Sequence, residues 1–156
     1  MTKLTKADDQ AGVKIHLHSK SAWRLQLKPG AVRQLQRLLS ADSFWAQGRK
    51  CSELRAMLHG SQASVSAWDH GRLIAFGRAT SDGVYRAVLW DVVVSQSHQG
   101  KGLGRCIVER LLSAPSLEHV ERIYIMTTNS CQFYAQVGFE IERKQLLMGI
   151  KNEDRE

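Results

Sequence analysis

Three glycines at alternating positions mark the segment in which the sequence is most informative about chemistry, Ser95–Arg105. The apolar run Val92-Val93-Val94 leads into this segment, and the pattern of an amphipathic helix begins at Leu103. Glycine permits positive φ and lets another molecule approach the backbone closely. A helix that starts here presents unpaired N–H groups and the positive end of its dipole. The segment therefore predicts an anion site suited to phosphates, with positive charge added by Lys101 and Arg105.

Two common phosphate-binding patterns do not fit these glycines. The P-loop needs Lys after its last glycine and then Ser or Thr, whereas Lys101 precedes Gly102 and no Ser or Thr is in register. The dinucleotide pattern GxGxxG needs a third glycine three residues after the second, and none stands there. The pattern that fits is Q-x-x-G-x-G, formed by Gln99, Gly102 and Gly104.

A second pattern follows about thirty residues later, in Phe133-Tyr134-Ala135-Gln136-Val137-Gly138-Phe139. Gly138 is expected to stop a helix there, and Phe139 to open an apolar strand. Together, the glycine loop and this FYxxxGF pattern resemble the GNAT family of acyl-CoA N-acetyltransferases, whose pyrophosphate loop reads Q-x-x-G-x-G. The resemblance covers roughly Ala63–Met148.

A longer run resembles the plastid and cyanobacterial branch of that family, which includes the plant serotonin N-acetyltransferases. Some of those enzymes also act on protein lysines. The run comprises Ala79–Gly83, Leu89–Val94 and Gln99–Gly104. These relatives often carry an Asp-Pro pair in the strand-to-loop turn, where this chain has Ser95-Gln96, so no acid is assigned a role at that point.

The resemblance implies transfer of acetyl from acetyl-CoA to a primary amine, by direct attack through a tetrahedral intermediate. The amine must first lose a proton, because an ammonium has no lone pair. The leaving thiolate must be stabilised or protonated, and the oxyanion needs a donor such as a strand N–H. No metal is expected to take part.

By the same resemblance, one strand and the loop after it hold the cofactor. The backbone of Val92, Val93 and Val94 would pair with the pantetheine arm like another strand, and one N–H there would polarise the thioester carbonyl. Their β-branched side chains suit an extended strand, although an ordinary buried strand has the same composition. The backbone amides expected to hold the pyrophosphate are those of Gln99, Gly100, Lys101, Gly102, Leu103, Gly104 and Arg105.

Tyr134 is the predicted general acid for the CoA sulfur and a predicted cofactor contact. A phenol has an ordinary pKa near 10 and is therefore protonated at neutral pH. In the family an asparagine that helps to hold the pantetheine commonly stands seven residues before this tyrosine, where this chain has Thr127. Asn129, two residues later, is predicted to take that part.

The base that removes the amine proton has two candidates. Asp91 lies on the long strand beside the expected reaction zone and could accept a proton directly or through a water. A strand carboxylate can equally be paired or solvated. His98 lies in the glycine-rich turn, where a solvent-exposed or phosphate-side role is the alternative.

A mixed α/β sheet of the GNAT fold is expected to position these residues, in the order β-α-α-β-β-β-α-β-α-β. Turn signals at Lys28-Pro29-Gly30, His70-Gly71 and Ser81-Asp82-Gly83 separate its parts. The expected strands are Lys14–Gln26, Ala63–Asp69, Leu73–Thr80, Val84–Val94, Arg122–Thr127 and Phe139–Met148. The expected helices are Ala31–Ser40, Lys50–His59, Leu103–Ser113 and Ser130–Val137. Residues 1–13 read as a flexible tail, and 14–150 as a single GNAT domain.

Composition bounds the class of protein. A chain of 156 residues with 43% hydrophobic residues is long enough for one domain with its own core. No apolar run approaches the roughly 18 residues of a membrane span, and the polar N-terminal segment predicts no secretory signal. Three cysteines without a CxxC pair favour a reducing cytosol over a disulfide framework or a zinc site.

The net charge of +7 lies in the first sixty residues, which hold eleven Lys and Arg against four Asp and Glu. This excess indicates either solvated helix faces or attraction of an anionic ligand or acidic partner. No zinc-finger, RNP or basic-aromatic pattern predicts a nucleic-acid partner.

Three functions remain open at this point. The first acceptor is a small primary amine, an arylalkylamine such as serotonin, with Phe44 and Trp45 either lining its pocket or capping the core. The second acceptor is a protein lysine or N-terminus. The basic N-terminal segment of this chain would attract a protein with an acidic surface. The third is CoA binding without catalysis. The sequence predicts no membrane partner, and it leaves monomer and homodimer open.

Overall fold

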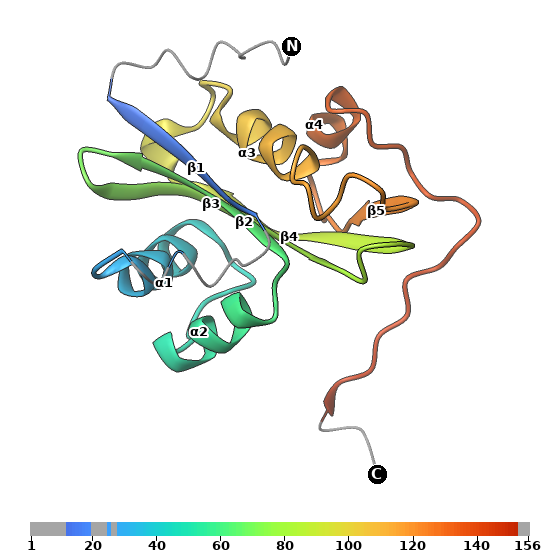
Figure 1. The fold of residues 1–156 in the computed structure, drawn as a ribbon, viewed down its shortest axis with the longest axis horizontal. Coiled ribbons are helices and arrows are strands. Elements are labelled where there is room, and N and C mark those ends of the chain that lie inside the picture. The colour runs from blue at the N-terminus through green and yellow to red at the C-terminus, as the bar shows by residue number, and fades with distance from the viewer. Residues whose placement is uncertain (1–11, 20–24, 26–27, 153–156) are drawn as a thin grey trace. The chain divides into compact units, whose positions relative to one another are not determined.

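The computed structural model describes residues 12–19, 25 and 28–152, and the chain divides into two compact units between Met126 and Thr127. We call Met1–Met126 the sheet unit and Thr127–Glu156 the C-terminal unit. Residues 1–11 of the predicted tail, and residues 20–24 and 26 of the first predicted strand, lie outside the described residues. The elements (Figure 1) are β1 (Val13–Ser19), α1 (Ala31–Asp42), α2 (Cys51–His59), β2 (Ala63–Asp69), β3 (Arg72–Ser81), β4 (Arg86–Val94), the 3-10 helix η3 (Gln96–His98), α3 (Leu103–Leu112), β5 (Arg122–Ile125) and α4 (Cys131–Gln136).

The predicted mixed sheet is confirmed. Its strands lie in the order β1-β2-β3-β4-β5, and only the β4–β5 pair is parallel. His70 and Gly71 both have positive φ, 45° and 79°, as a tight two-residue hairpin turn requires. At the next hairpin the Asp82 carboxylate accepts hydrogen bonds from the backbone N–H groups of Val84, Tyr85 and Arg86. The turn chemistry predicted from sequence therefore builds the meander.

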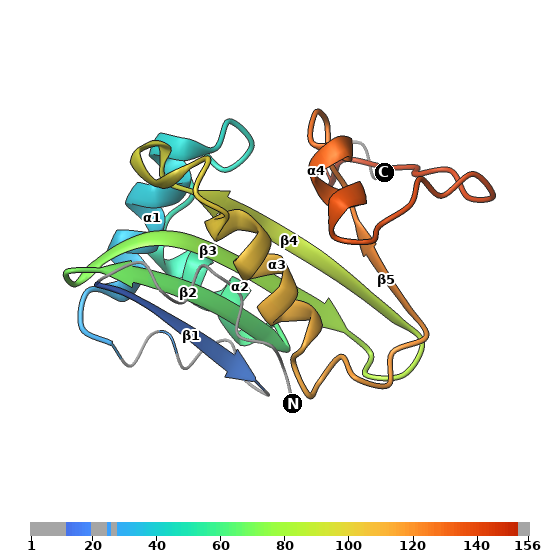
Figure 2. The same cartoon turned by 90° about the horizontal axis from the view of Figure 1, so that it is seen from above.

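Helices cover both faces of this sheet: α1 and α2 lie on one face and α3 on the other (Figures 1 and 2). On the first face Leu35, Leu39, Leu54 and Phe76 are fully buried in one apolar cluster. On the second face Gly77 of β3 leaves room for α3. A Cβ atom at this position would lie 2.8 Å from Ile107 Cγ2 and 3.1 Å from Leu111 Cδ1. The absence of a side chain at Gly77 thus sets how closely α3 approaches the strand that carries it.

Strand β4 contains one residue more than β3 at its centre. Val93 pairs with Phe76, and Trp90 pairs with Arg78. Three residue steps along β4 therefore lie opposite two steps along β3. The extra residue is accommodated at Asp91, whose φ is 53°. Such a β-bulge bends the strand and redirects the backbone beyond it. The bulge therefore sets the direction of Val92–Val94, the residues predicted to contact the cofactor.

The prediction of a last strand over Phe139–Met148 is wrong: the structure describes these residues without a strand. Ile141, Leu146 and Met148 are 71%, 90% and 90% exposed. Apolar alternation indicates which side chains share a face, but a strand also needs a neighbour whose backbone accepts and donates hydrogen bonds. The local pattern carries no information about that neighbour.

The C-terminal unit contains α4, which ends at the predicted glycine. Gly138 has φ 103°, the Gly138 N–H donates to the Ala135 carbonyl, and the Phe139 N–H donates to the Tyr134 carbonyl. These two bonds form a Schellman motif, which closes a helix through a glycine in left-handed conformation. The rings of Tyr134 and Phe139 lie 5.9 Å apart, the apolar contact that accompanies this motif. The FYxxxGF pattern therefore encodes a helix end that fixes the tyrosine.

Candidate active site

The glycine loop lies between the end of β4 and the first turn of α3, as predicted. Ser95 starts it: this buried residue donates its backbone N–H to the Ile74 carbonyl at 2.8 Å. The Gln99 side chain then reaches back and donates from Nε2 to the Val94 carbonyl at 2.9 Å. These two contacts anchor the first part of the loop to the sheet.

Two glycines of the loop adopt left-handed backbone conformations. Gly100 has φ 73° and Gly102 has φ 81°, and a Cβ at either position would meet no protein atom within 4 Å. Gly102 is also the N-cap of α3 and provides no side-chain cap. The first amides of a helix have no partner within the helix. Here no side chain of the N-cap covers them, and the space beside Gly102 is open.

Two cations flank the start of α3. Lys101 is exposed, and its Nζ lies 3.3 Å from the Ser97 carbonyl. Arg105 is exposed, and its Nε donates to Glu109 Oε1 at 2.7 Å, one helical turn away. With the helix dipole, these side chains make the loop a site of positive potential. The residues present therefore fit a diphosphate.

Two acidic residues that sequence reasoning missed hold the first half of the loop. The Gln96 backbone N–H donates to Asp42 Oδ1 at 3.0 Å, and His98 Nε2 lies 3.3 Å from Asp69 Oδ2. The other ring nitrogen of His98 lies 2.9 Å from Ser95 Oγ. The predicted base His98 is thus engaged on both ring nitrogens. Neither acid is near the loop in sequence, so no local signal could have identified them.

Beyond the bulge, one edge of β4 has no strand partner among the described residues of the sheet unit. The parallel pairing with β5 runs from Arg86 to Leu89 and stops there, because β5 ends at Ile125. On the other side Val93 and Val94 pair with β3. The backbone of the three valines therefore has hydrogen-bonding capacity on its β5 side, as pairing with an extended ligand requires.

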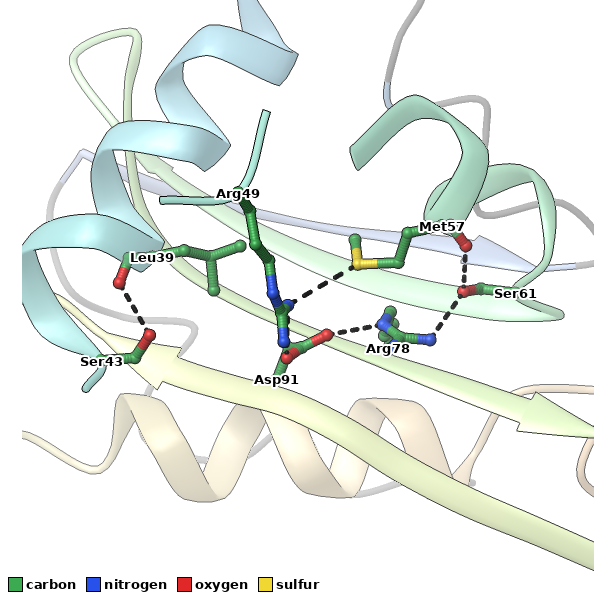
Figure 3. A network of polar contacts seen from close by, with 7 residues as sticks. All are labelled: Leu39, Ser43, Arg49, Met57, Ser61, Arg78 and Asp91. Carbon is green, nitrogen blue, oxygen red and sulfur yellow. Dashed lines mark hydrogen bonds and ion pairs between the residues drawn. The ribbon is translucent and has the colours of Figure 1, made fainter. Parts of the chain in front are cut away.

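Asp91 is held between two arginines from other parts of the chain (Figure 3). Oδ1 accepts a hydrogen bond from Arg49 Nη1 at 3.0 Å, and Oδ2 accepts one from Arg78 Nε at 2.7 Å. The Asp91 side chain is 4% exposed. Arg78 also donates to Ser61 Oγ at 3.2 Å. The sequence identified the acid but neither arginine, since Arg49 and Arg78 are 42 and 13 residues away.

Tyr134 and Asn129 belong to the C-terminal unit. The Tyr134 ring makes edge contacts with Phe133 and Phe139, at 4.8 and 5.9 Å between centroids. Burial raises the pKa of Tyr134 above its ordinary value of 10.0, so the phenol is fully protonated at neutral pH. Asn129 is exposed, and its Oδ1 accepts a hydrogen bond from Ser130 Oγ at 3.1 Å.

Phe44 and Trp45 lie in the connection between α1 and α2. Their rings make a T-shaped contact at 5.1 Å, and the side chains are 65% and 48% exposed. More than half of Phe44 and nearly half of Trp45 face solvent, so both roles, lining an amine pocket and capping the core, stay predictions.

The fold and the glycine loop after β4 can be compared with known proteins. Residues 32–139 match the model of the acetyltransferase (GNAT) family, which is more than half of the chain. The chain belongs to this family.

The relatives include chloroplastic and cyanobacterial proteins, as the sequence indicated. The chain is 44% identical over 81 residues to serotonin N-acetyltransferase 2, chloroplastic, of rice (Oryza sativa subsp. japonica), covering 51% of this chain and 39% of the rice protein. It is 34% identical over 85 residues to a histone acetyltransferase of Glycine max, covering 54% and 35%. It is 30% identical over 116 residues to an uncharacterized ycf52-like N-acetyltransferase of Prochlorococcus marinus, covering 71% and 63%. The chain thus spans less than two thirds of the length of each of these relatives.

Solved structures share the fold. A GNAT family acetyltransferase from Streptococcus pneumoniae superimposes with a TM-score of 0.69 at 18% identity, covering 90% of this chain and 98% of that one. Among the residues that the structure describes, no helix is long and apolar enough to cross a membrane.

Proposed function

We propose that this chain transfers acetyl from acetyl-CoA to a primary amine, and that the acceptor is a small arylalkylamine such as serotonin. The observation that carries the reaction is the loop at residues 99–105: left-handed glycines and an uncapped helix start lie directly after a strand with a free edge. Family membership supports the same reaction. The relative named as a serotonin N-acetyltransferase supports the acceptor class.

In this proposal the sheet unit binds and orients the cofactor, which supplies an activated acetyl thioester. The amides of Gln99 to Arg105 hold the diphosphate, and Lys101 and Arg105 add charge around it. The free edge of Val92–Val94 pairs with the pantetheine arm. One N–H of this edge donates to the carbonyl oxygen at which negative charge develops.

The C-terminal unit supplies the proton donor. Tyr134 gives its phenolic proton to the departing sulfur, and the phenol, whose pKa burial raises above 10.0, is protonated at neutral pH. Asn129 is proposed to help to hold the pantetheine arm.

The proton of the amine leaves through a water or directly to a base, for which Asp91 and His98 remain the predictions. Both oxygens of Asp91 already accept guanidinium hydrogen bonds, and both ring nitrogens of His98 have partners. A relay through water suits these engaged groups better than direct contact with the amine.

The second candidate function is acetylation of protein lysines or N-termini. The match to a histone acetyltransferase of Glycine max favours it. The basic excess of the first sixty residues would attract an acidic protein surface. The cysteine pattern supports a cytosolic location for the protein. The name of the rice relative places that protein in the chloroplast.

The test is release of free thiol from acetyl-CoA with a panel of amines: serotonin, tryptamine, spermidine and lysine peptides. Saturable release with the arylalkylamines and none with peptides supports the first function, and the reverse selects the second. CoA binding without release for any amine would leave only a CoA-binding module and would contradict both enzymatic proposals.

A further inference from the structure

The backbone at Asp91 is unusual for its place in the fold. Among the described residues only two non-glycine residues have positive φ, His70 and Asp91. His70 lies in an exposed hairpin turn, where this conformation is ordinary. Asp91 lies buried in the middle of a strand. A residue persists in such a conformation only when its surroundings fix it more strongly than the strain opposes it.

The surroundings of Asp91 are two guanidinium groups with different attachments. Arg78 lies on β3, the strand paired with β4, and its side chain is 14% exposed. Arg49 lies in the connection between α1 and α2, with 32% of its side chain exposed. Each guanidinium takes one carboxylate oxygen, so the aspartate has one partner in the sheet and one outside it (Figure 3).

Each arginine is in turn attached to a helix. The Arg49 carbonyl accepts a hydrogen bond from Gln36 Nε2 of α1 at 2.9 Å. Arg78 donates to Ser61 Oγ, and that hydroxyl donates to the Met57 carbonyl of α2 at 2.7 Å. The network therefore links α1, α2 and β3 to the single residue at which β4 changes direction.

Asp91, Arg49 and Arg78 balance one another's charges. Two guanidiniums face one carboxylate, and the carboxylate is almost fully buried. Loss of Asp91 would leave two positive charges facing each other. Loss of Arg49 would leave a pair in which one carboxylate oxygen has no partner. Either change removes the hydrogen bonds that oppose the strain at the bulge.

We propose that Arg49 and Arg78 are positioning residues, which act through Asp91 to hold the bulge of β4. In this role they set the direction of the Val92–Val94 edge and the place of the α1–α2 connection that carries Phe44 and Trp45. The link to acetyl transfer rests on the proposed function. The effect on the strand itself does not, because it is a property of the ligand-free protein.

The first measurement is amide hydrogen exchange of Val92, Val93 and Val94 in the ligand-free protein. Arg49→Met keeps an unbranched apolar stem and removes the guanidinium charge, and Asp91→Asn keeps the shape of the side chain and its tolerance of positive φ. Both are expected to exchange on the order of tenfold faster than the wild type at those of these amides that pair with β3. Arg49→Lys restores a cation and is expected to recover part of the protection. Arg37→Met, an exposed arginine on α1, is the matched control and leaves exchange unchanged.

The second measurement is steady-state acetyl transfer by the same variants. Misplacement of the edge predicts a fall in kcat/KM of about 10- to 100-fold for Arg49→Met. The double variant Arg49→Met with Asp91→Asn should lose little more than either single variant, because the residues act as one unit. Arg49→Met should lower kcat/KM without removing a limb of the pH profile, because a positioning residue does not itself transfer the proton.

Two results would overturn the proposal. One is unchanged exchange at Val92–Val94 in both single variants while their melting temperatures show that they are folded. The other is loss of the acidic limb of the pH profile in Asp91→Asn alone, with Arg49→Met fully active, which would make Asp91 the base and the arginines incidental. If no amine is acetylated by the wild type, the exchange result still decides the structural claim.

Discussion

Tyr134 shows how one side chain can be fixed by the end of a short helix. Its carbonyl accepts the closing hydrogen bond from Phe139, and its ring lies against the Phe139 ring. The contact that ends the helix is therefore also the contact that orients the phenol. Burial raises the pKa of that phenol above 10.0, because the charged phenolate is poorly solvated there.

Replacing Tyr134 with Phe should lower kcat by about 100-fold or more, the usual contribution of a general acid, with the Kd of acetyl-CoA nearly unchanged. Tyr85→Phe, at an exposed tyrosine of the β3–β4 hairpin, is the matched control and should keep full activity. Steady-state rates with separate binding measurements check both. A Tyr134→Phe enzyme with the wild-type kcat would remove the tyrosine from the mechanism.

The pH dependence follows from the direction of the Tyr134 pKa. The phenol donates only when it is protonated. Because its pKa lies above 10.0, deprotonation of Tyr134 lowers the activity of the enzyme only above pH 10. The same raised pKa means that its stabilising effect on the fold is present below pH 10 and is lost as pH rises through the folded-state pKa. We expect kcat to show no tyrosine-dependent decline between neutral pH and pH 10. A limb within that range that disappears in Tyr134→Phe would contradict this assignment.

At the scale of elements, α3 serves both packing and binding. Its buried face, which includes Ile107 and Leu111, packs against the sheet at Gly77, while its first turn projects uncapped amides. The position of the loop therefore depends on how closely the helix lies on β3. Gly77 in β3 and the glycines of the loop therefore both help to determine where the first turn of α3 lies.

Substitution of Gly77 by Ala should destabilise the fold by about 1–3 kcal/mol, as overpacking of a core does, because the new methyl would lie 2.8 Å from Ile107 Cγ2. Gly60→Ala is the control: its nearest contact would be 3.7 Å, an ordinary separation. Urea unfolding of the two variants measures the difference. Equal midpoints would show that α3 can shift without loss and that its distance from the sheet is not set at Gly77.

At the scale of the whole molecule, what the sequence predicted was local. Strand β2 has the predicted bounds, and β3 and α2 differ from prediction by a single residue at one or both ends. The glycine loop is where its pattern placed it, because turn and helix-start signals are written in adjacent residues. The hydrogen bonds of Asp42, Asp69, Arg49 and Arg78 were not predictable, since each joins residues brought together only by folding.

Two errors share one physical cause. The bulge at Asp91 was missed because a period of two along β4 does not reveal where its partner strand has one residue fewer. The strand over Phe139–Met148 was predicted from the apolar residues that follow the helix-stopping Gly138, without a neighbour to pair with. In both cases the deciding information lies in a second strand. Single-strand patterns fix which side chains share a face, but not the pairing.

Calorimetric measurement of the Kd of acetyl-CoA for the wild type, Gly102→Val and Gly30→Val decides whether the glycine loop binds the cofactor. Both glycines are helix N-caps in left-handed conformation, with φ 81° and 72°, and neither has a protein atom within 4 Å of an added Cβ. The backbone strain of the two substitutions is thus matched, and only Gly102 lies at the loop. We predict that Gly102→Val weakens binding by about tenfold or more, equivalent to 1.4 kcal/mol, while Gly30→Val binds like the wild type. Equal affinities for all three proteins would contradict the claim that the amides of residues 99–105 hold the diphosphate.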